Sequence, residues 1–325
     1  MDMEFKVGSG GFVKYVDHIG SDESLVRTAR KSTTRGFVSW EPYFRCKHKL
    51  CSAWKFFVEP GWRDYSTASW STGLTHIHER GESFPRGDLG ILMYMMENRH
   101  TSPIEFGEII FDLRIPMDIW RQVVRHRTAN VSEYSTRYSE AIDEMATTAP
   151  DEWRTQGTSN RQGSSGLLPE EDGRGLSVVE AEFHARARDV YKHRLELGVA
   201  KEQARKDLPL SNYTEVFWKM DLHNLFHFLS LRLDQHAQKE ARDFGQAIAS
   251  IVKELFPRTY EAFEEHKLGS VTFSRTQYNV LVKLLKSTDG GISFTDPLRV
   301  QGHPYYGDEK KSERAKFLSK IGIKE

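Results

Sequence analysis

The stretch Arg121 to Glu140, RQVVRHRTANVSEYSTRYSE, concentrates arginine, histidine, carboxylate, hydroxyl and tyrosine side chains. Upstream of it, Pro116 can occupy the first turn of a helix, where its missing N–H costs nothing. The apolar residues that follow recur at helical spacing: Ile119, Trp120, Val123 and Val124. We therefore predict a helix that buries this face, ends near Arg127 and exposes a polar stripe of Arg121, Gln122, Arg125 and His126.

Residues 128–140 show no apolar periodicity, so they are predicted to form an ordered binding loop on that rigid helix. Their polar side chains include Asn130, Ser132, Glu133, Ser135, Arg137 and Tyr138. Planar guanidinium groups suit phosphate and carboxylate, and hydroxyl and carboxylate groups suit the edge of a nucleobase or a sugar. The alternative is a surface helix with a solvated basic face. Such a face would use lysine as freely as arginine, and no lysine occurs between Arg121 and Glu140, so the stretch favours a site for an anion.

Within this stretch, Arg125-His126-Arg127, seven further residues and Ser135 follow the RHR-x7-S signature of the flavin-dependent thymidylate synthases (the ThyX family), which the chain resembles. The segment from Glu133 to Ser139 matches the extension of that signature. The resemblance continues in three further segments, which occur in the family's order: Gly11 to Ser32, Asn98 to Pro116 and Ala204 to Arg242. A match of this length and order is specific.

The resemblance implies an α+β fold, a ThyX-like domain that mixes helices with antiparallel sheet. The synthase domain is expected over residues 1–268, interrupted by an insertion at about residues 33–86 and followed by a C-terminal extension, residues 269–325. The implied reaction is reductive methylation of dUMP to dTMP without an enzyme nucleophile. Methylenetetrahydrofolate donates the carbon, and FAD reduced by NADPH supplies the hydride. The implied active unit is a homotetramer with active sites at subunit interfaces, which fits the absence of a Gly-rich dinucleotide fingerprint.

The resemblance also implies the roles of individual residues. The residues expected to bind dUMP are Gln122, Arg127, Glu133, Ser135, Arg137, Arg205 and Arg232. The residues expected to bind FAD are Ser32, Ser102, Glu105, Arg125, His126, Arg127, Glu133, Asp221, His223 and His227. Arg205 would reach the nucleotide phosphate in a neighbouring subunit's site.

The catalytic residues implied are Arg232, Ser135 and His100. Arg232 would stabilise negative charge on the uracil by electrostatics. No general base is patterned beside Ser135, so its hydroxyl is expected to bind the nucleotide and not to act as a nucleophile. His100 would lie on the folate and flavin face of the pocket.

Two other functions stay open from residue types alone. His223 and His227 lie one turn apart, and Arg232, His236 and Glu240 follow at spacings of four, which would suit a metal-dependent hydrolase acting on nucleotides. No glutamate accompanies the pair in HExxH fashion, and Arg232 would repel a cation, so no metal is expected. The second alternative is a nucleotide- or RNA-binding module. The net charge is zero and no basic stretch is interleaved with aromatic residues, so nucleic acid is not expected as a partner.

The composition is typical of a globular protein: 38% of the 325 residues are hydrophobic, and 46 basic side chains balance 46 acidic ones. No apolar run is long enough for a transmembrane helix, and the N-terminus is too polar for a signal peptide. Only two cysteines occur, which fits a reducing compartment. The chain is therefore expected to be soluble and intracellular (cytoplasmic), with no membrane partner.

The segment Thr33 to Pro85 holds both cysteines and four of the seven tryptophans, so it is expected to be an insertion with its own small core. Its possible zinc ligands are Cys46, His48, Cys51, His76 and His78. The spacing of the two cysteines is not the short CxxC of common zinc modules, so buried thiols and surface histidines are favoured over a zinc site.

Elsewhere, periodicity predicts a strand at residues 12–16, a helix from Ser21 or Asp22 to about Ser32, and a helix from Asp88 to Asn98. Alternation at Ile109, Phe111 and Leu113 predicts a half-buried strand. Residues 149–175, rich in Gly, Ser, Asn and Gln, are expected to form a long loop that could act as a lid. Two further helices are expected, over residues 178–197 with Val179, Phe183, Ala187, Val190 and Tyr191 inward, and over residues 247–263. A helical segment is expected in the tail at residues 278–286.

Overall fold

The computed structural model describes residues 3–32, 41–46, 68–69, 75–76, 78–83, 86–157, 163–276 and 278–279. The chain divides into two compact units, Met1–Gly269 and Ser270–Glu325. Every helix and strand named below belongs to the first unit. None of the described helices combines the length and the apolar content that a bilayer-spanning segment needs.

A five-stranded antiparallel sheet organises the first unit, in the order β1-β2-β7-β11-β8. Its strands are β1 (Glu4–Val7), β2 (Gly11–Ile19), β7 (Glu108–Pro116), β11 (Tyr213–Asp221) and β8 (Asn130–Glu133). In β7, every second side chain is fully buried: Ile109, Phe111, Leu113 and Ile115. This is the period of two predicted for residues 109–113, and it gives the sheet an apolar face that must be covered.

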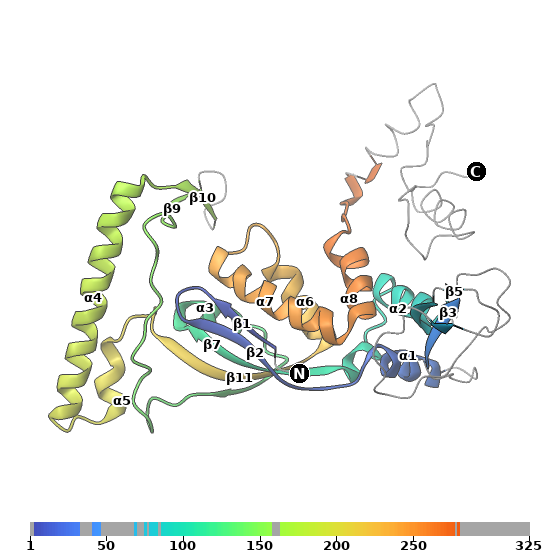
Figure 1. The fold of residues 1–325 in the computed structure, drawn as a ribbon. Helices are drawn as coiled ribbons and strands as arrows, with labels where there is room; N and C mark the ends of the chain where they lie inside the picture. The colour runs from blue at the N-terminus through green and yellow to red at the C-terminus, as the bar shows by residue number, and fades with distance from the viewer. Residues whose placement is uncertain are drawn as a thin grey trace. The chain divides into compact units, whose positions relative to one another are not determined.

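Three helices pack over the sheet (Figure 1): α6 (Leu222–Arg232), α7 (Lys239–Leu255) and α8 (Pro257–Phe263). Trp218 of β11 is fully buried, with its ring centroid 6.1 Å from that of Phe111 and 5.0 Å from that of Phe228 on α6. The single helix predicted over residues 247–263 is two helices instead. Pro257 has no N–H with which to continue α7, so it begins α8 at the first helical position.

α1 (Asp22–Lys31) follows β2 as predicted, and the Ser21 side chain caps it by accepting a hydrogen bond from the Ser24 N–H at 3.2 Å. Asp22 is almost fully buried. Its carboxylate accepts hydrogen bonds from the Arg258 N–H at 2.7 Å and from the N–H and hydroxyl of Thr259 at 2.9 and 2.5 Å. Asp22 therefore fastens the first helix of the chain to the start of α8.

Between α1 and α2 (Arg86–Glu97), the described backbone forms two small antiparallel pairs. β3 (Glu41–Cys46) pairs with β6 (His78–Ser83), and β4 (Ala68–Ser69) pairs with β5 (Thr75–His76). The small core and the zinc ligands considered for this segment lie outside the residues whose side chains are described, and most of the predicted tail helix, residues 278–286, also lies outside the described residues. The 3-10 helix η1 (Ile104–Phe106) then connects α2 to β7.

The long loop predicted at residues 149–175 is wrong in part. It contains a hairpin of β9 (Arg154–Gln156) and β10 (Ser164–Leu167), and α4 (Glu170–Glu196) begins eight residues earlier than predicted. The hydrophobic pattern of α4 begins only after its first two turns, so a prediction based on that pattern places the start of the helix too late. The helix also does not turn its whole apolar stripe inward: Tyr191 is buried, but Val179 and Phe183 are 60% and 56% exposed. α5 (Lys201–Ala204) and the 3-10 helix η2 (Arg205–Asp207) return the chain to β11.

Candidate functional site

The arginine-rich signature lies in a turn and not on the helix that precedes it. α3 (Met117–Val123) ends before Arg125, so the predicted placement of Arg125 and His126 on the helix is wrong. Pro116 is the last residue of β7, paired with Tyr213, and serves as the N-cap of α3. The helix is short because the chain must leave it at once to reach β8, which begins at Asn130 and pairs with β11.

The predicted binding loop after the signature contains strand β8, at the edge of the sheet. Glu133 lies opposite Val216 and Asn130 lies opposite Lys219, and all four β8 side chains are exposed. A strand that buries neither face has no apolar alternation, which is why the sequence pattern did not reveal it. The edge position fixes the backbone of these residues while leaving their side chains open to a ligand.

The carboxylate of Glu133 is held by two donors. Its Oε2 accepts from the Trp120 Nε1–H and its Oε1 from the Thr214 hydroxyl, each at 3.0 Å. Trp120 belongs to the buried face of α3, and Thr214 is a buried residue of β11. From the sequence, Trp120 was predicted only to be part of the buried apolar face, although its indole N–H indicated that it would need an acceptor. These bonds orient Glu133 before any ligand arrives.

Arg232, the last residue of α6, brings the signature and the helix together. Its Nη2 donates to the Gln122 carbonyl oxygen at 2.9 Å and lies 3.4 Å from Nε2 of His126. The centroid of the His126 ring lies 5.0 Å from that of Phe228, in a T-shaped pair, and 5.8 Å from that of His227. Four of the predicted site residues, Gln122, His126, His227 and Arg232, are therefore neighbours.

Arg232 keeps unused hydrogen-bonding capacity. Its Nε is buried, and no acceptor within the described ranges lies in reach of it. α7 packs closely against Arg232, since a Cβ added at Gly245 would lie 3.1 Å from Cβ of Arg232. Burial also lowers the pKa of Arg232 from its usual value. A buried donor with no partner is costly unless something supplies an acceptor, so Arg232 fits a ligand oxygen.

Arg205 contacts the turn that carries Ser135, and Arg137 extends from that turn to α5. Nη1 of Arg205 donates to the Thr136 hydroxyl at 2.5 Å, and Nε of Arg137 lies 3.3 Å from Oε2 of Glu202. The Ser135 carbonyl accepts from the N–H groups of Tyr138 and Ser139, which closes the turn. Here Arg205 lies beside the Ser135 turn of its own chain, and its role toward a neighbouring subunit stays a prediction.

The remaining residues implied for FAD and folate form a looser set. Ser32 ends α1, where its hydroxyl donates to the Ala29 carbonyl at 2.8 Å. His100 is exposed and stacks on Tyr94 at 5.4 Å, and Ser102 and Glu105 are exposed around η1. Asp221 caps α6 by accepting from the Asn224 N–H at 2.9 Å, and His223 is half-buried in the first turn of that helix. η1 contacts both α1 and α6, which places these segments side by side.

The stripe that suggested a metal-dependent hydrolase does not exist as predicted. Arg232 ends α6, and Glu240 belongs to α7, so Arg232, His236 and Glu240 do not share one helix face. His236 Nδ1 instead lies 2.8 Å from Oδ1 of Asp234. Among the side chains that the structure describes, no group of three or more His, Cys, Asp or Glu is arranged to hold a metal ion.

His126 is held in its neutral form. Burial, aided by the positive charge of Arg232 and by the nearby His227 ring, lowers the pKa of His126 from 6.5 to about 4. At neutral pH its Nε2 can therefore accept a hydrogen bond from Arg232.

Acidification should destabilise the folded protein between about pH 6.5 and pH 4 through His126. In this window the unfolded chain binds a proton at His126 and the folded chain does not, so lowering the pH favours unfolding, and the effect levels off below the folded pKa. Urea unfolding midpoints measured against pH should show a weaker acid dependence for His126→Asn than for the unchanged protein. Identical pH dependence in both would contradict this assignment.

The family model described as thymidylate synthase complementing protein matches residues 55–258, a range that includes α3, the arginine turn, β8, β11 and α6. The match begins inside the segment that the sequence predicted to be an insertion.

Two relatives and one solved structure extend this match. The chain is 37% identical over 286 residues to the flavin-dependent thymidylate synthase of Ehrlichia ruminantium (strain Gardel), covering 88% of this chain and 81% of that protein. It is 38% identical over 276 residues to a flavin-dependent thymidylate synthase of Thermus thermophilus, covering 85% of this chain and 83% of that protein. The structure of PolB from Streptomyces cacaoi, a UMP/dUMP methylase bound with 5-Br dUMP, has a TM-score of 0.60 and 25% identity, covering 81% of this chain and 98% of that chain.

The likeness to PolB confirms the predicted α+β fold with its antiparallel sheet. The family model matches more than half of the chain, and both relatives exceed 30% identity over most of their length. The chain therefore belongs to the family of flavin-dependent thymidylate synthases.

Proposed function

We propose that this protein methylates dUMP to dTMP, with methylenetetrahydrofolate as the carbon donor and NADPH-reduced FAD as the hydride source. Reduction of the methylene adduct needs a hydride, which no side chain supplies and which bound FAD, once reduced by NADPH, would supply. The chain's own residues bind and orient the nucleotide, hold its charge and keep the flavin beside it.

The observation that carries this proposal is the state of Arg232. Its guanidinium is held by the Gln122 carbonyl, lies beside the neutral ring of His126, and retains a buried Nε without an acceptor in the described part of the chain. A uracil carbonyl oxygen would satisfy that donor. As C5 of the uracil becomes nucleophilic, negative charge grows on such an oxygen, and a preoriented, partly desolvated arginine stabilises it.

The exposed arginines fit the phosphates of the nucleotide and of FAD. Arg121, Arg125 and Arg127 are exposed, and no carboxylate among the described residues forms an ion pair with them. Guanidinium groups without a carboxylate partner can donate two parallel N–H hydrogen bonds to phosphate oxygens. The roles assigned to the FAD and dUMP residues above belong to this proposal, including Arg205 toward the nucleotide phosphate.

The proposal includes a homotetramer with active sites at subunit interfaces. α4 leaves Val178, Val179 and Phe183 between 55% and 60% exposed, an apolar surface that a second copy of the chain would cover. We assign residues 1–268 to the synthase domain and residues 269–325 to a C-terminal extension, in keeping with the boundary between the two compact units. Light scattering of the purified protein measures the oligomeric state.

The test of the function is a spectrum followed by product analysis. The purified protein, loaded with FAD, is mixed anaerobically with NADPH, with and without dUMP, and the oxidised-flavin absorbance is followed. We expect faster bleaching with dUMP, and dTMP detected by mass spectrometry once methylenetetrahydrofolate is added. A protein that takes up no FAD, or that forms no dTMP while binding metal or RNA, would overturn the proposal.

A further inference from the structure

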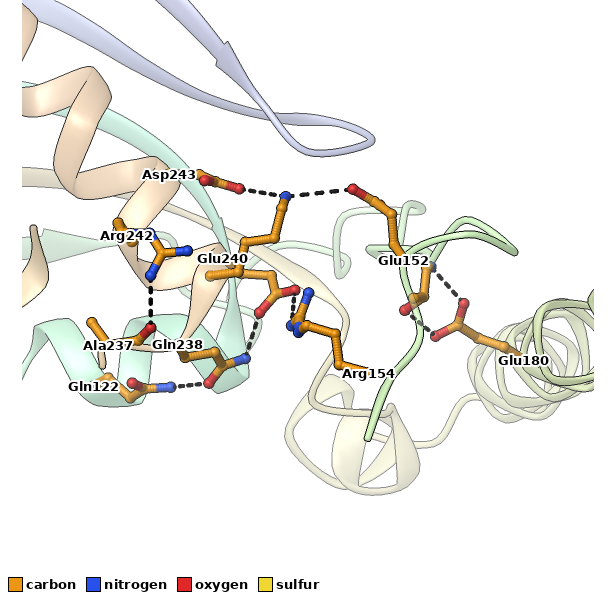
Figure 2. A network of polar contacts seen from close by, with 11 residues as sticks. Gln122, Glu152, Arg154, Glu180, Ala237, Gln238, Glu240, Arg242 and Asp243 are labelled. Carbon is orange, nitrogen blue, oxygen red and sulfur yellow. Dashed lines mark hydrogen bonds and ion pairs between the residues drawn. The ribbon is translucent and has the colours of Figure 1, made fainter. Parts of the chain in front are cut away.

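A chain of hydrogen bonds connects the β9–β10 hairpin to Gln122 (Figure 2). Nη2 of Arg154 donates to Oε1 of Glu240 at 2.5 Å, and Nε2 of Gln238 donates to Oε2 of the same carboxylate at 2.9 Å. Nε2 of Gln122 in turn donates to Oε1 of Gln238 at 2.7 Å. We call Arg154, Glu240, Gln238 and Gln122 the amide network.

The direction of every bond in the amide network follows from Glu240. A carboxylate only accepts hydrogen bonds, so Gln238 must turn its NH2 group toward Glu240. The side-chain oxygen of Gln238 then faces Gln122, so Gln122 must donate to it from its own NH2 group. This leaves the side-chain oxygen Oε1 of Gln122 and one N–H of its NH2 group for other partners. The O and N of an amide have nearly the same shape, and the orientation of the Gln122 amide is thus decided by Glu240, two hydrogen bonds away.

Glu240 is kept ionised where it lies. Burial raises the pKa of its carboxyl group, but hydrogen bonds from Arg154, from the backbone and from Gln238, with the charge of Arg154, outweigh burial and lower the pKa below its usual value. Arg154 and Glu240 also line, with Gln238, a cavity of about 1360 Å³ between the hairpin and the start of α7. His126 and Arg232 do not line this cavity, so the amide network joins its wall to the neighbouring candidate site.

We propose that Arg154, Glu240 and Gln238 are positioning residues that set the orientation of the Gln122 amide and thereby the affinity for the pyrimidine nucleotide. This inference rests on the proposed function, in which Gln122 contacts dUMP. Gln122 is also bound through its backbone, since its carbonyl oxygen accepts from Arg232 at 2.9 Å. The network therefore adjusts the side chain of a residue whose main chain is already fixed.

Glu240→Gln is the test substitution, because it keeps the size of the side chain while it removes the acceptor-only character together with the negative charge that pairs with Arg154. Arg154 and Gln238 use separate oxygens of Glu240. An amide at this position offers one oxygen and one NH2 group. Either Arg154 or Gln238 must then direct its N–H group at the NH2 group of that amide. If Gln238 turns over to relieve that contact, Gln122 must turn over as well.

The chain offers a matched control in Glu152. Oε1 of Glu152 lies 3.4 Å from Nζ of Lys239, so this ion pair also links the segment around the hairpin to the first turn of α7. Lys239 retains a second partner, Asp243, at 2.9 Å. Glu152→Gln weakens the attachment of the hairpin without touching the amide network.

The experiment measures the dissociation constant for dUMP by titration calorimetry, on FAD-loaded protein, for the unchanged chain, Glu240→Gln, Glu152→Gln, Gln122→Ala and the double variant Glu240→Gln/Gln122→Ala. We expect Glu240→Gln to weaken binding about tenfold, since losing one correctly directed hydrogen bond costs roughly that factor. Glu152→Gln should change binding less than about twofold, as for most exposed ion pairs. In the Gln122→Ala background, Glu240→Gln should have no further effect. Thermal unfolding and flavin content of each variant verify that it is folded.

The outcomes separate this inference from the proposed function. If Gln122→Ala leaves the affinity for dUMP unchanged, the assignment of Gln122 within the proposed function fails, and the inference falls with it. If Gln122→Ala weakens binding but Glu240→Gln does not, or has the same effect with and without Gln122, the inference is overturned and the proposed function stands. Equal losses in Glu152→Gln and Glu240→Gln would mean that docking of the hairpin matters and the amide network does not.

Discussion

Replacing Arg232 with alanine should lower the rate of dTMP formation by about 100- to 1000-fold, the range found when one preorganised donor to a developing negative charge is removed. The guanidinium is already fixed by the Gln122 carbonyl at 2.9 Å and has a buried Nε to offer, so little reorganisation is needed when charge develops. The measurement is single-turnover dTMP formation by FAD-loaded protein at saturating dUMP. Arg232→Lys should recover only part of the rate, because an ammonium group cannot donate in the planar geometry of a guanidinium.

The control for this prediction is Arg174→Ala. Arg174 is a 70% exposed side chain on α4, and its one ion-pair partner among the described residues is Glu170, one turn away at 2.9 Å. Its loss therefore tests the effect of removing a positive charge at a distance. Its rate should equal that of the unchanged protein. A rate for Arg232→Ala within about fivefold of the unchanged protein would remove Arg232 from the chemistry, because it would leave about 1 kcal/mol for its role.

Replacing Trp218 with alanine should destabilise the protein by about 3–5 kcal/mol, as expected for emptying a large aromatic position in a packed core. The side chain is fully buried between Phe111 and Phe228, whose ring centroids lie at 6.1 and 5.0 Å. Phe228 also meets the His126 ring edge to face at 5.0 Å, so the cavity should loosen the histidine of the signature. Urea unfolding, monitored by the far-UV circular dichroism of the backbone, measures the change in the free energy of unfolding.

Trp218→Phe is the matched control. The indole Nε1 of Trp218 is buried without an acceptor among the described residues, so phenylalanine removes a costly unpaired N–H while keeping an aromatic ring in place. We expect it to cost less than half of the alanine variant. Equal destabilisation by both substitutions would show that the shape of the indole, and not the filling of the core, decides the stability of the sheet.

The elements that the sequence predicted well are those whose pattern comes from burial on one face. β7 shows alternation because it is a central strand with one covered face, and α1 begins where a serine can cap it. The signature identified the family through residue identity. It could not reveal that Arg125 and His126 lie in a turn, because a helical stripe and a turn can present the same residues.

The features that the sequence did not predict depend on partners far away in the chain. β8 is a strand because β11, more than 80 residues later, offers it an edge, and its own four exposed residues carry no pattern. Gln122 and Gln238 are separated by 116 residues, and Arg154 and Glu240 by 86, so no local spacing links them. The exposed Phe183 on α4 was predicted inward because periodicity shows which residues share a face and not whether anything covers it.

The bond between Asp22 and Thr259 sets an order of events during synthesis. The two residues are 237 positions apart, and a ribosome that adds 5–20 residues per second needs roughly 10–50 s to bridge them. During that interval the Asp22 carboxylate stays in water, and the first helix has no α8 to dock on. The nascent chain must therefore keep β2 and α1 from aggregating until the last helices of the unit emerge, so chaperone contact should last longer for α1 than for α8.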